Sequence, residues 1–377
     1  MSNKQLVLCR IAACFVLIAF SCLPGAFAES KLGFSAFVVD EEMIGVSEEL
    51  WLQQRIFLLD DDLSIVSDVK TENGSFVVQD LSDPSVVYSV SDASYACLDG
   101  VSHDEKLNSE DKVYRYILNE HGSFSVKPFR IDSRLLWSNE IILAFDGIEH
   151  PYVLAIPDWP DDFTYYIARI SDSGFDRCFE KGICHEGWDS AAWKWSTEFT
   201  AVSDSGKVAV TVSDSWGSHS RLYLYDLENG VVTQIGDQFN IAGPILWYDE
   251  DHILTCLFTK EESVFSLIDV RSAEAVSLRT QNGDKLLLDY TPDMAMALNS
   301  NRTKLAFWSN RYEWHEGVDD LTLNLVDLNT GDIRTLLFTC YSDSFLSSYG
   351  KIYVLEAKGK QVFVPYSDYI PSVFFME

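Results

Sequence analysis

The chain has 377 residues, of which 47% are hydrophobic and 13% aromatic, a composition that excludes a disordered protein and allows a large buried core. Its formal net charge is −30 at pH 7. A surface this acidic repels nucleic acid and anionic lipid, and it can attract cations or basic partners. The favoured alternative is that the charge serves solubility alone.

The first 28 residues are typical of an export signal, with basic residues near the start, a short apolar run at residues 11–20 and small residues before the cleavage point. We expect cleavage after Ala28, a single domain over residues 29–377, and a secreted or periplasmic location. An uncleaved membrane anchor is the alternative, although the apolar run is shorter than the roughly 20 residues that a spanning helix needs. A lipoprotein signal at Cys22 is a further alternative, which the bulky Phe20 disfavours.

After the leader, short stretches of alternating apolar and polar residues, separated by turn-forming residues, predict β-strands along the whole chain. The strands group into units at residues 34–69, 76–129, 135–178, 196–237, 245–278, 294–338 and 345–375. The first of these units is expected to supply four short strands of its own. A blade of a β-propeller takes about 40–50 residues. The pattern therefore predicts an all-β propeller of seven four-stranded blades, with six or eight blades as alternatives.

Asp226, Asp269 and Asp327 occupy equivalent positions in three of these units. Each follows an alternating strand and precedes a turn. Gly230 and Gly331 stand in two of the turns, where glycine can adopt the positive φ that a tight hairpin needs. Repetition at this spacing is the sequence signature of a repeat architecture and favours the propeller.

Residues 203–207 and 303–307, with the strands around them, resemble the TolB-like propeller repeat. The consensus of that repeat is Ser-Pro-Asp-Gly-Lys, a strand ending in Ala-Phe, another strand with Asp-Leu, and a glycine turn. The proline is missing in both copies here, and Asn301 and Arg302 stand where Asp and Gly are expected. The resemblance implies the fold. The family includes envelope interaction proteins and propeller domains attached to peptidases, so the resemblance implies no catalytic residues.

Of the eight cysteines, five follow the leader, and an odd number leaves at least one thiol unpaired within the chain. Cys178 and Cys184 flank Gly182, which lets the chain turn back, so we expect a small-loop disulfide between them in an oxidising compartment. A metal site formed by these cysteines and His185 is the alternative, but it lacks clear further ligands. Cys256 lies in an alternating strand and is expected to be a buried thiol.

The sequence contains no Gly-x-Ser-x-Gly nucleophile motif, phosphate loop, dinucleotide fingerprint or His-Glu-x-x-His metal motif. We therefore predict no catalytic residue, cofactor or metal. The abundance of acids leaves one enzymatic alternative open, a glycosidase or lyase with an acidic site in the central channel.

Aromatic loops give the candidate binding surface. Residues 185–195 hold three tryptophans, and two other units carry aromatic insertions at the same connection, between their second and third strands. Tryptophan offers a large contact area and stacks on sugars or basic side chains. The structural alternative is that these rings fill the space between blades. The candidate binding residues are Trp188, Trp193, Trp195, Trp216, Trp314 and His315.

The sequence thus predicts an exported, non-catalytic propeller that binds a protein or a glycan as an interaction module of the cell envelope or exterior. We expect a monomer with no nucleic-acid partner and no integral membrane segment after cleavage. A structural role in assembly of the envelope is a further alternative.

Overall fold

The computed structural model describes residues 30–39, 52–71, 76–90, 113–119, 121–129, 140–144, 152–155, 166–171, 174–176, 195–214, 220–226, 229–258, 263–288, 292–313, 318–341, 352–357, 359–365 and 372–377. The secondary structure of this part is strand only, β1 to β27, so the all-β class is confirmed. No helix in it is long and apolar enough to cross a membrane. The expected export signal and its cleavage site lie outside the described residues.

Four sheets have their strands paired in chain order, each antiparallel to the next. Blade 2 consists of β4 (Phe76–Gln79), β5 (Val86–Val90), β6 (Val113–Leu118) and β7 (Phe124–Phe129). Blade 3 consists of β8 (Glu140–Ala144), β9 (Tyr152–Ala155), β10 (Tyr166–Ser171) and β11 (Gly174–Asp176). Blade 4 consists of β12 (Trp195–Val202), β13 (Lys207–Asp214), β14 (Ser220–Asp226) and β15 (Val231–Phe239). Blade 5 consists of β16 (Ile241–Trp247), β17 (His252–Phe258), β18 (Ser263–Asp269) and β19 (Ala275–Ser277), with β20 (Leu287–Leu288) also paired to β18.

A larger sheet joins the two ends of the chain. Blade 6 lies within it and consists of β21 (Pro292–Leu298), β22 (Lys304–Glu313), β23 (Val318–Asp327) and β24 (Ile333–Tyr341). Blade 1 consists of β1 (Lys31–Val39), β2 (Leu52–Leu59) and β3 (Ile65–Lys70), with β27 (Val373–Met376) paired to β1. Between the two blades, β25 (Ile352–Ala357) pairs with β24, and β26 (Lys360–Pro365) pairs with β1.

The end of the chain differs from the expectation. Residues 345–375 do not form a blade of their own in the described structure, and the first unit takes its fourth strand from β27. The physical reason is that all four residues of β27 are buried, so the strand must pack on both faces and cannot lie at an exposed edge. The described strands make six four-stranded units, and a count of seven is not confirmed.

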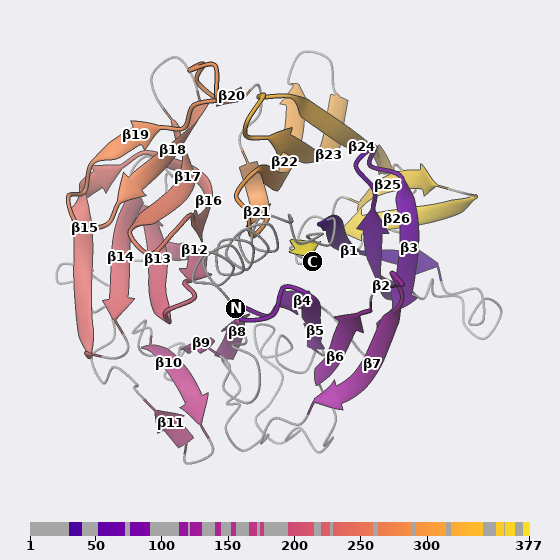
Figure 1. Cartoon of the computed structure of the whole chain (residues 1–377), viewed down its shortest axis with the longest axis horizontal. Helices are drawn as coiled ribbons and strands as arrows, with labels where there is room; N and C mark the ends of the chain where they lie inside the picture. The colour runs from indigo at the N-terminus through magenta and orange to yellow at the C-terminus, as the bar shows by residue number, and fades with distance from the viewer. Residues whose placement is uncertain are drawn as a thin grey trace, which may run out of the picture. The chain divides into compact units, whose positions relative to one another are not determined.

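Within Lys31–Met376 the blades follow one another around a common centre (Figure 1). The strand of each blade that lies nearest this centre is its inner strand, and each inner strand contacts that of the next blade. The order of contacts is β4, β8, β12, β16, β21 and β27. The side chain of Gln79, at the end of β4, donates a hydrogen bond to the carbonyl of Phe375 in β27 and so connects the last inner strand to the first. This cycle of contacts is what defines a β-propeller.

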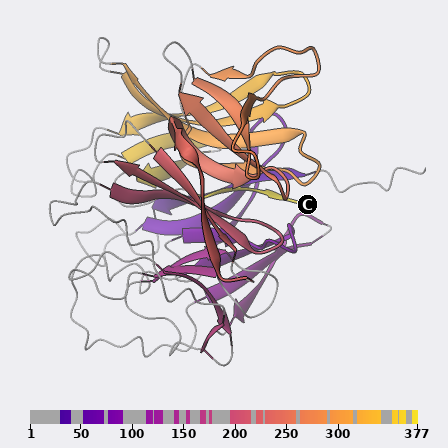
Figure 2. The ribbon, with the colours of Figure 1, turned by 90° about the vertical axis from the view of Figure 1, so that its left-hand side faces the viewer.

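The twisted sheets are stacked face against face (Figure 2), and their apolar faces form the core. Phe265 of blade 5 meets Phe307 of blade 6 with 5.4 Å between ring centroids. Trp308, on the other face of blade 6, lies 5.8 Å from the ring of Phe34 in blade 1. Each blade therefore buries its apolar faces against the neighbouring blades.

The repeated aspartates cap the turns between the third and outer strands. Asp269 Oδ1 accepts hydrogen bonds from the amides of Arg271 at 2.7 Å and Ser272 at 2.9 Å. The same type of contact fixes the turns that begin at Asp60, Asn119, Asp226 and Asp327. The equivalence of Asp226, Asp269 and Asp327 is thus confirmed, and its cause is the ability of a short carboxylate to satisfy turn amides.

Candidate functional site

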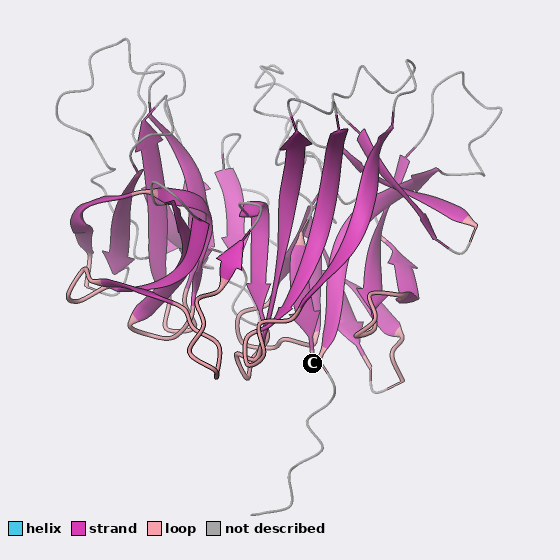
Figure 3. Ribbon diagram, turned by 90° about the horizontal axis from the view of Figure 1, so that it is seen from above, coloured by secondary structure: helices cyan, strands magenta, loops and turns pink. Residues whose placement is uncertain are grey.

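A cavity of about 520 Å³ lies where the inner strands end. Its walls are the last residues of β4, β12, β16 and β21, the turns that follow them, and Val373 and Phe375 of β27. Most of the described turns lie at one end of the strands, the lower end in this view (Figure 3). The charged and aromatic members of the lining are Asp80, Asp204, Trp247, Tyr248, Asp249, Glu250, Arg302 and Phe375.

In each of the turns that follow these inner strands, a short polar side chain accepts hydrogen bonds from backbone amides. Asp249 Oδ1 accepts hydrogen bonds from the amides of Asp251 and His252, each 2.9 Å long. Equivalent caps come from the side chains of Asp80, Ser203 and Asn299. Asx and Ser turns of this kind need an oxygen on a short side chain, which explains why small polar residues recur here. Two of the four lining acids, Asp80 and Asp249, therefore hold turns in place.

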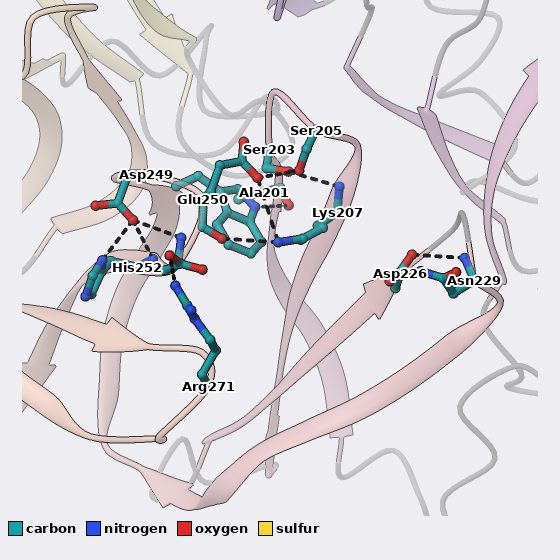
Figure 4. Close-up of polar contacts among 12 residues, drawn as sticks. Ala201, Ser203, Ser205, Lys207, Asp226, Asn229, Asp249, Glu250, His252 and Arg271 are labelled. Atoms are coloured by element: carbon teal, nitrogen blue, oxygen red, sulfur yellow. Dashed lines mark hydrogen bonds and ion pairs between the residues drawn. The ribbon is translucent and has the colours of Figure 1, made fainter.

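Asp249 also contacts a histidine at the start of β17 (Figure 4). The Nδ1 atom of His252 lies 2.8 Å from Asp249 Oδ1, and its Nε2 atom lies 3.8 Å from Asp269 Oδ2. The imidazole thereby connects the two capped turns of blade 5 at the end of the blade that carries the cavity.

Glu250, the next residue, ties blade 5 to blade 4 (Figure 4). Ser205 Oγ donates a hydrogen bond of 2.5 Å to Glu250 Oε2, and Lys207 Nζ lies 3.8 Å from the same oxygen. Trp247 adds a second tie, because its Nε1 donates a 3.1 Å hydrogen bond to the carbonyl of Ala201. These contacts fix the wall of the cavity between β12 and β16.

Asp204 follows the capping residue of blade 4, and its side chain is exposed. The protein around it nevertheless removes enough water from the carboxylate to raise its pKa, and the charge of Glu250 adds to the rise. The charge of Arg302 acts in the opposite direction. A positive group bound beside Asp204 would therefore stabilise the ionised form of its carboxylate.

Arg302 faces Tyr248 across the boundary between blades 6 and 5. The central carbon of its guanidinium lies 5.4 Å from the centroid of the tyrosine ring, within the range of a cation–π interaction. Its backbone has a φ of 57°, in the left-handed region. The equivalent turn position of blade 4 is Gly206, with a φ of 83°.

Chemically, the cavity is suited to a positively charged group, because four carboxylates and an aromatic face surround it. Among the described residues, no group of three or more His, Cys, Asp or Glu is arranged to hold a metal ion.

The structure describes almost none of the predicted binding surface. Trp188, Trp193, Trp216, Trp314 and His315 lie outside the described residues, as do Cys178 and Cys184. Trp195 begins β12, where its backbone pairs with that of Asp214. These aromatic residues and the disulfide stay predictions.

The two aromatic insertions join the second strand of a blade to the third. In an antiparallel sheet that connection starts at one end of the strands, and the turn after the first strand lies at the opposite end. The cavity lies at the end that carries the turn after the first strand.

The prediction missed the cavity acids, because they are spread over turns about 50 to 120 residues apart in the chain. The signal that could have found them is their shared position in the turn that follows an inner strand.

Cys256 is confirmed as a buried thiol in β17. Its side chain is fully enclosed, and this burial raises its pKa to about 12, so it has no acidic or nucleophilic character at neutral pH.

No family model matches the chain, and no curated protein matches it in sequence. TolB from Acinetobacter baumannii is similar in structure at 10% identity, with 86% of this chain and 79% of that chain covered and a TM-score of 0.39. The β-propeller domain of the trilobed protease from Pyrococcus furiosus is similar at 12% identity, with 91% of each chain covered and a TM-score of 0.43. A puromycin hydrolase mutant is similar at 10% identity, with 85% of this chain and 56% of that chain covered and a TM-score of 0.40.

Proposed function

We propose that the chain is an exported, non-catalytic β-propeller that binds another protein, and that the cavity at the ends of the inner strands receives a basic segment of that partner. The observation that carries this proposal is the lining of the cavity. Among the described lining residues, the carboxylates of Asp80, Asp204, Asp249 and Glu250 share it with a single guanidinium.

Long-range electrostatics supports the same ligand class. The whole chain has a formal net charge of −30 at pH 7. A field of this sign attracts basic partners and raises their association rate, while it disfavours acidic ones. A basic segment would therefore meet favourable potential both far from the cavity and inside it.

The roles of the lining acids favour binding over catalysis. A channel hydrolase needs two carboxyl groups with separate roles, one as an acid and one as a nucleophile or base. Asp80 and Asp249 hold turns, and Glu250 is engaged by Ser205 and Lys207. Only Asp204, among these four, has its carboxylate directed to no hydrogen-bond partner that the structure shows.

Export belongs to the same proposal. The leader at residues 1–28 would place the mature protein in the cell envelope or outside the cell, where the aromatic residues Trp188, Trp193 and Trp314 would offer a second surface for a protein or a glycan. Sequencing of the mature N-terminus is expected to start at Glu29, and a mature chain that begins at Met1 would contradict export.

The test is a titration of the mature protein with a fluorescent hexa-arginine peptide, with a hexa-glutamine peptide as the neutral reference. Asp204→Asn is expected to weaken binding of the arginine peptide about fivefold, the effect of one charge near a protein surface. The matched control is Asp284→Asn, which neutralises an exposed acid outside the cavity and is expected to leave affinity unchanged. Equal binding of both peptides, or equal loss in both variants, would contradict the proposal.

A further inference from the structure

Among the described residues that line the cavity, Arg302 is the one cationic side chain. Its guanidinium lies over Tyr248, 5.4 Å from the ring centroid, and its charge favours the ionised form of Asp204. An aromatic face beside a carboxylate is the environment that proteins offer to a bound cation. Arg302 therefore occupies the place where the cation of a ligand would have its best contacts.

The backbone at Arg302 does not require arginine. The Arg302 amide donates to the Asn299 carbonyl at 2.9 Å, and the Gly206 amide donates to the Ser203 carbonyl at 2.9 Å in the same turn of blade 4. Glycine makes this turn without the steric cost that a side chain has at positive φ. Arginine therefore does not stabilise the backbone of the turn, and a role of Arg302 must come from the contacts of its side chain.

We propose that Arg302 is an internal competitor for the cation subsite formed by Tyr248 and Asp204, and that the guanidinium or ammonium group of a basic peptide displaces it on binding. This inference rests on the proposed function and adds the ligand group and the residue that sets its affinity. The bound cation would lie on the ring of Tyr248 beside Asp204, and Arg302 would turn out toward solvent. Because a ligand must displace Arg302, a weakly binding cation has a low affinity for the subsite. A peptide that carries several positive charges binds more tightly and displaces Arg302.

The experiment compares the wild-type mature protein with Arg302→Gln, which removes the charge but keeps a long polar side chain. We expect the variant to bind the hexa-arginine peptide about threefold to fivefold more tightly, the value of one exposed cation–π contact. Arg302→Gly is expected to give the same gain with an unchanged or higher Tm, because glycine relieves the positive φ. Circular dichroism checks that each variant is folded.

Two controls distinguish an effect of the cation subsite on affinity from an effect of the protein's net charge. Arg271→Gln removes the same charge from an exposed turn outside the cavity and is expected to leave affinity within about twofold of wild type, since distant surface charges are screened by salt. Tyr248→Leu is expected to abolish the gain when it is combined with Arg302→Gln, because the two residues share one interaction.

The outcomes distinguish this inference from the proposed function. Tighter binding by Arg302→Gln supports the inference, also in the case where wild type shows no measurable binding. Equal or weaker binding by the variant, with wild type bound, overturns the inference and leaves the proposed function standing, because Arg302 would then contact the ligand or take no part. Absence of binding by both proteins overturns the two together.

Discussion

The side chain of Gln79 donates a hydrogen bond to the main-chain carbonyl of Phe375, although the two residues are 296 positions apart. Ser372 adds a second contact, since its Oγ donates a 2.5 Å hydrogen bond to the carbonyl of Val77. The two contacts join the inner strands of blades 1 and 2. Gln79 and Phe375 also line the cavity, so the contacts that close the ring also form part of the wall of the candidate site.

Gly33→Ala is expected to destabilise the protein. Gly33 in β1 pairs with Phe374 in β27, and a Cβ atom at Gly33 would come within 2.2 Å of the Phe374 ring. Overpacking of this kind costs about 1–3 kcal/mol of unfolding free energy. Urea unfolding gives the value. The cost is expected to shrink when Phe374→Ala is already present, and the same cost in both backgrounds would show that β27 does not pack on Gly33.

Trp308 is expected to contribute through packing rather than through a hydrogen bond. Its side chain is fully buried against Phe34 and Phe338, and its Nε1 atom has no hydrogen-bond partner among the residues that the structure describes. Trp308→Ala should lower the unfolding free energy by about 3–5 kcal/mol, and Trp308→Phe by much less, because the phenyl ring refills most of the space. Equal losses in thermal unfolding of the two variants would contradict this account.

Asp204→Asn is expected to stabilise the protein at neutral pH while it weakens binding. The pKa of Asp204 is raised in the folded state, so the folded protein binds its proton more tightly than the unfolded chain does. Its contribution to stability is present at low pH and is lost as pH rises through the folded pKa. Asparagine removes that loss, and the gain should vanish as pH falls towards about 4, the ordinary value for aspartate.

Urea unfolding of wild type and Asp204→Asn at pH 7 and at pH 4 measures this difference. A variant that is less stable than wild type at pH 7 would mean that the Asp204 carboxylate has a favourable partner in the folded state, and the assignment of Asp204 as the available acid would be wrong.

Cys256 is expected to be unreactive in the folded protein. It is fully buried, and burial raises its pKa to about 12, so almost no thiolate exists at pH 8. Iodoacetamide at pH 8, followed by mass spectrometry of the peptide that contains Cys256, should show modification only after unfolding in urea. Rapid labelling of the native protein would place this residue outside the core.

Most of the fold could be predicted from the sequence because blades are local. The strands of blade 4 and blade 6 match the units expected at residues 196–237 and 294–338, and the aspartates that marked the repeat turned out to cap turns within a few residues of themselves. Local hydrogen bonds of this kind leave a pattern that recurs along the chain.

The closure of the ring could not be predicted in the same way. The four residues Val373–Met376 are apolar on both sides, so they carry no alternation that would show which strand they join. Their partner, β1, lies at the other end of the chain, and a pairing at this separation leaves no spacing to recognise. The cavity was missed for the same reason, since Asp80, Asp204 and Glu250 meet only when the blades are arranged in a ring.

β27 is the inner strand of blade 1, and its pairing with β1 closes the propeller around the cavity. Native-state amide hydrogen exchange at Phe374 and Met376 is the most direct test, with β13 of blade 4 as the reference, because the register places these two amides on the side of β27 that faces β1. They are expected to exchange as slowly as the amides of β13, because only global unfolding exposes an inner strand. Fast exchange of both amides in a protein whose β13 remains protected would show that β27 is not paired with β1.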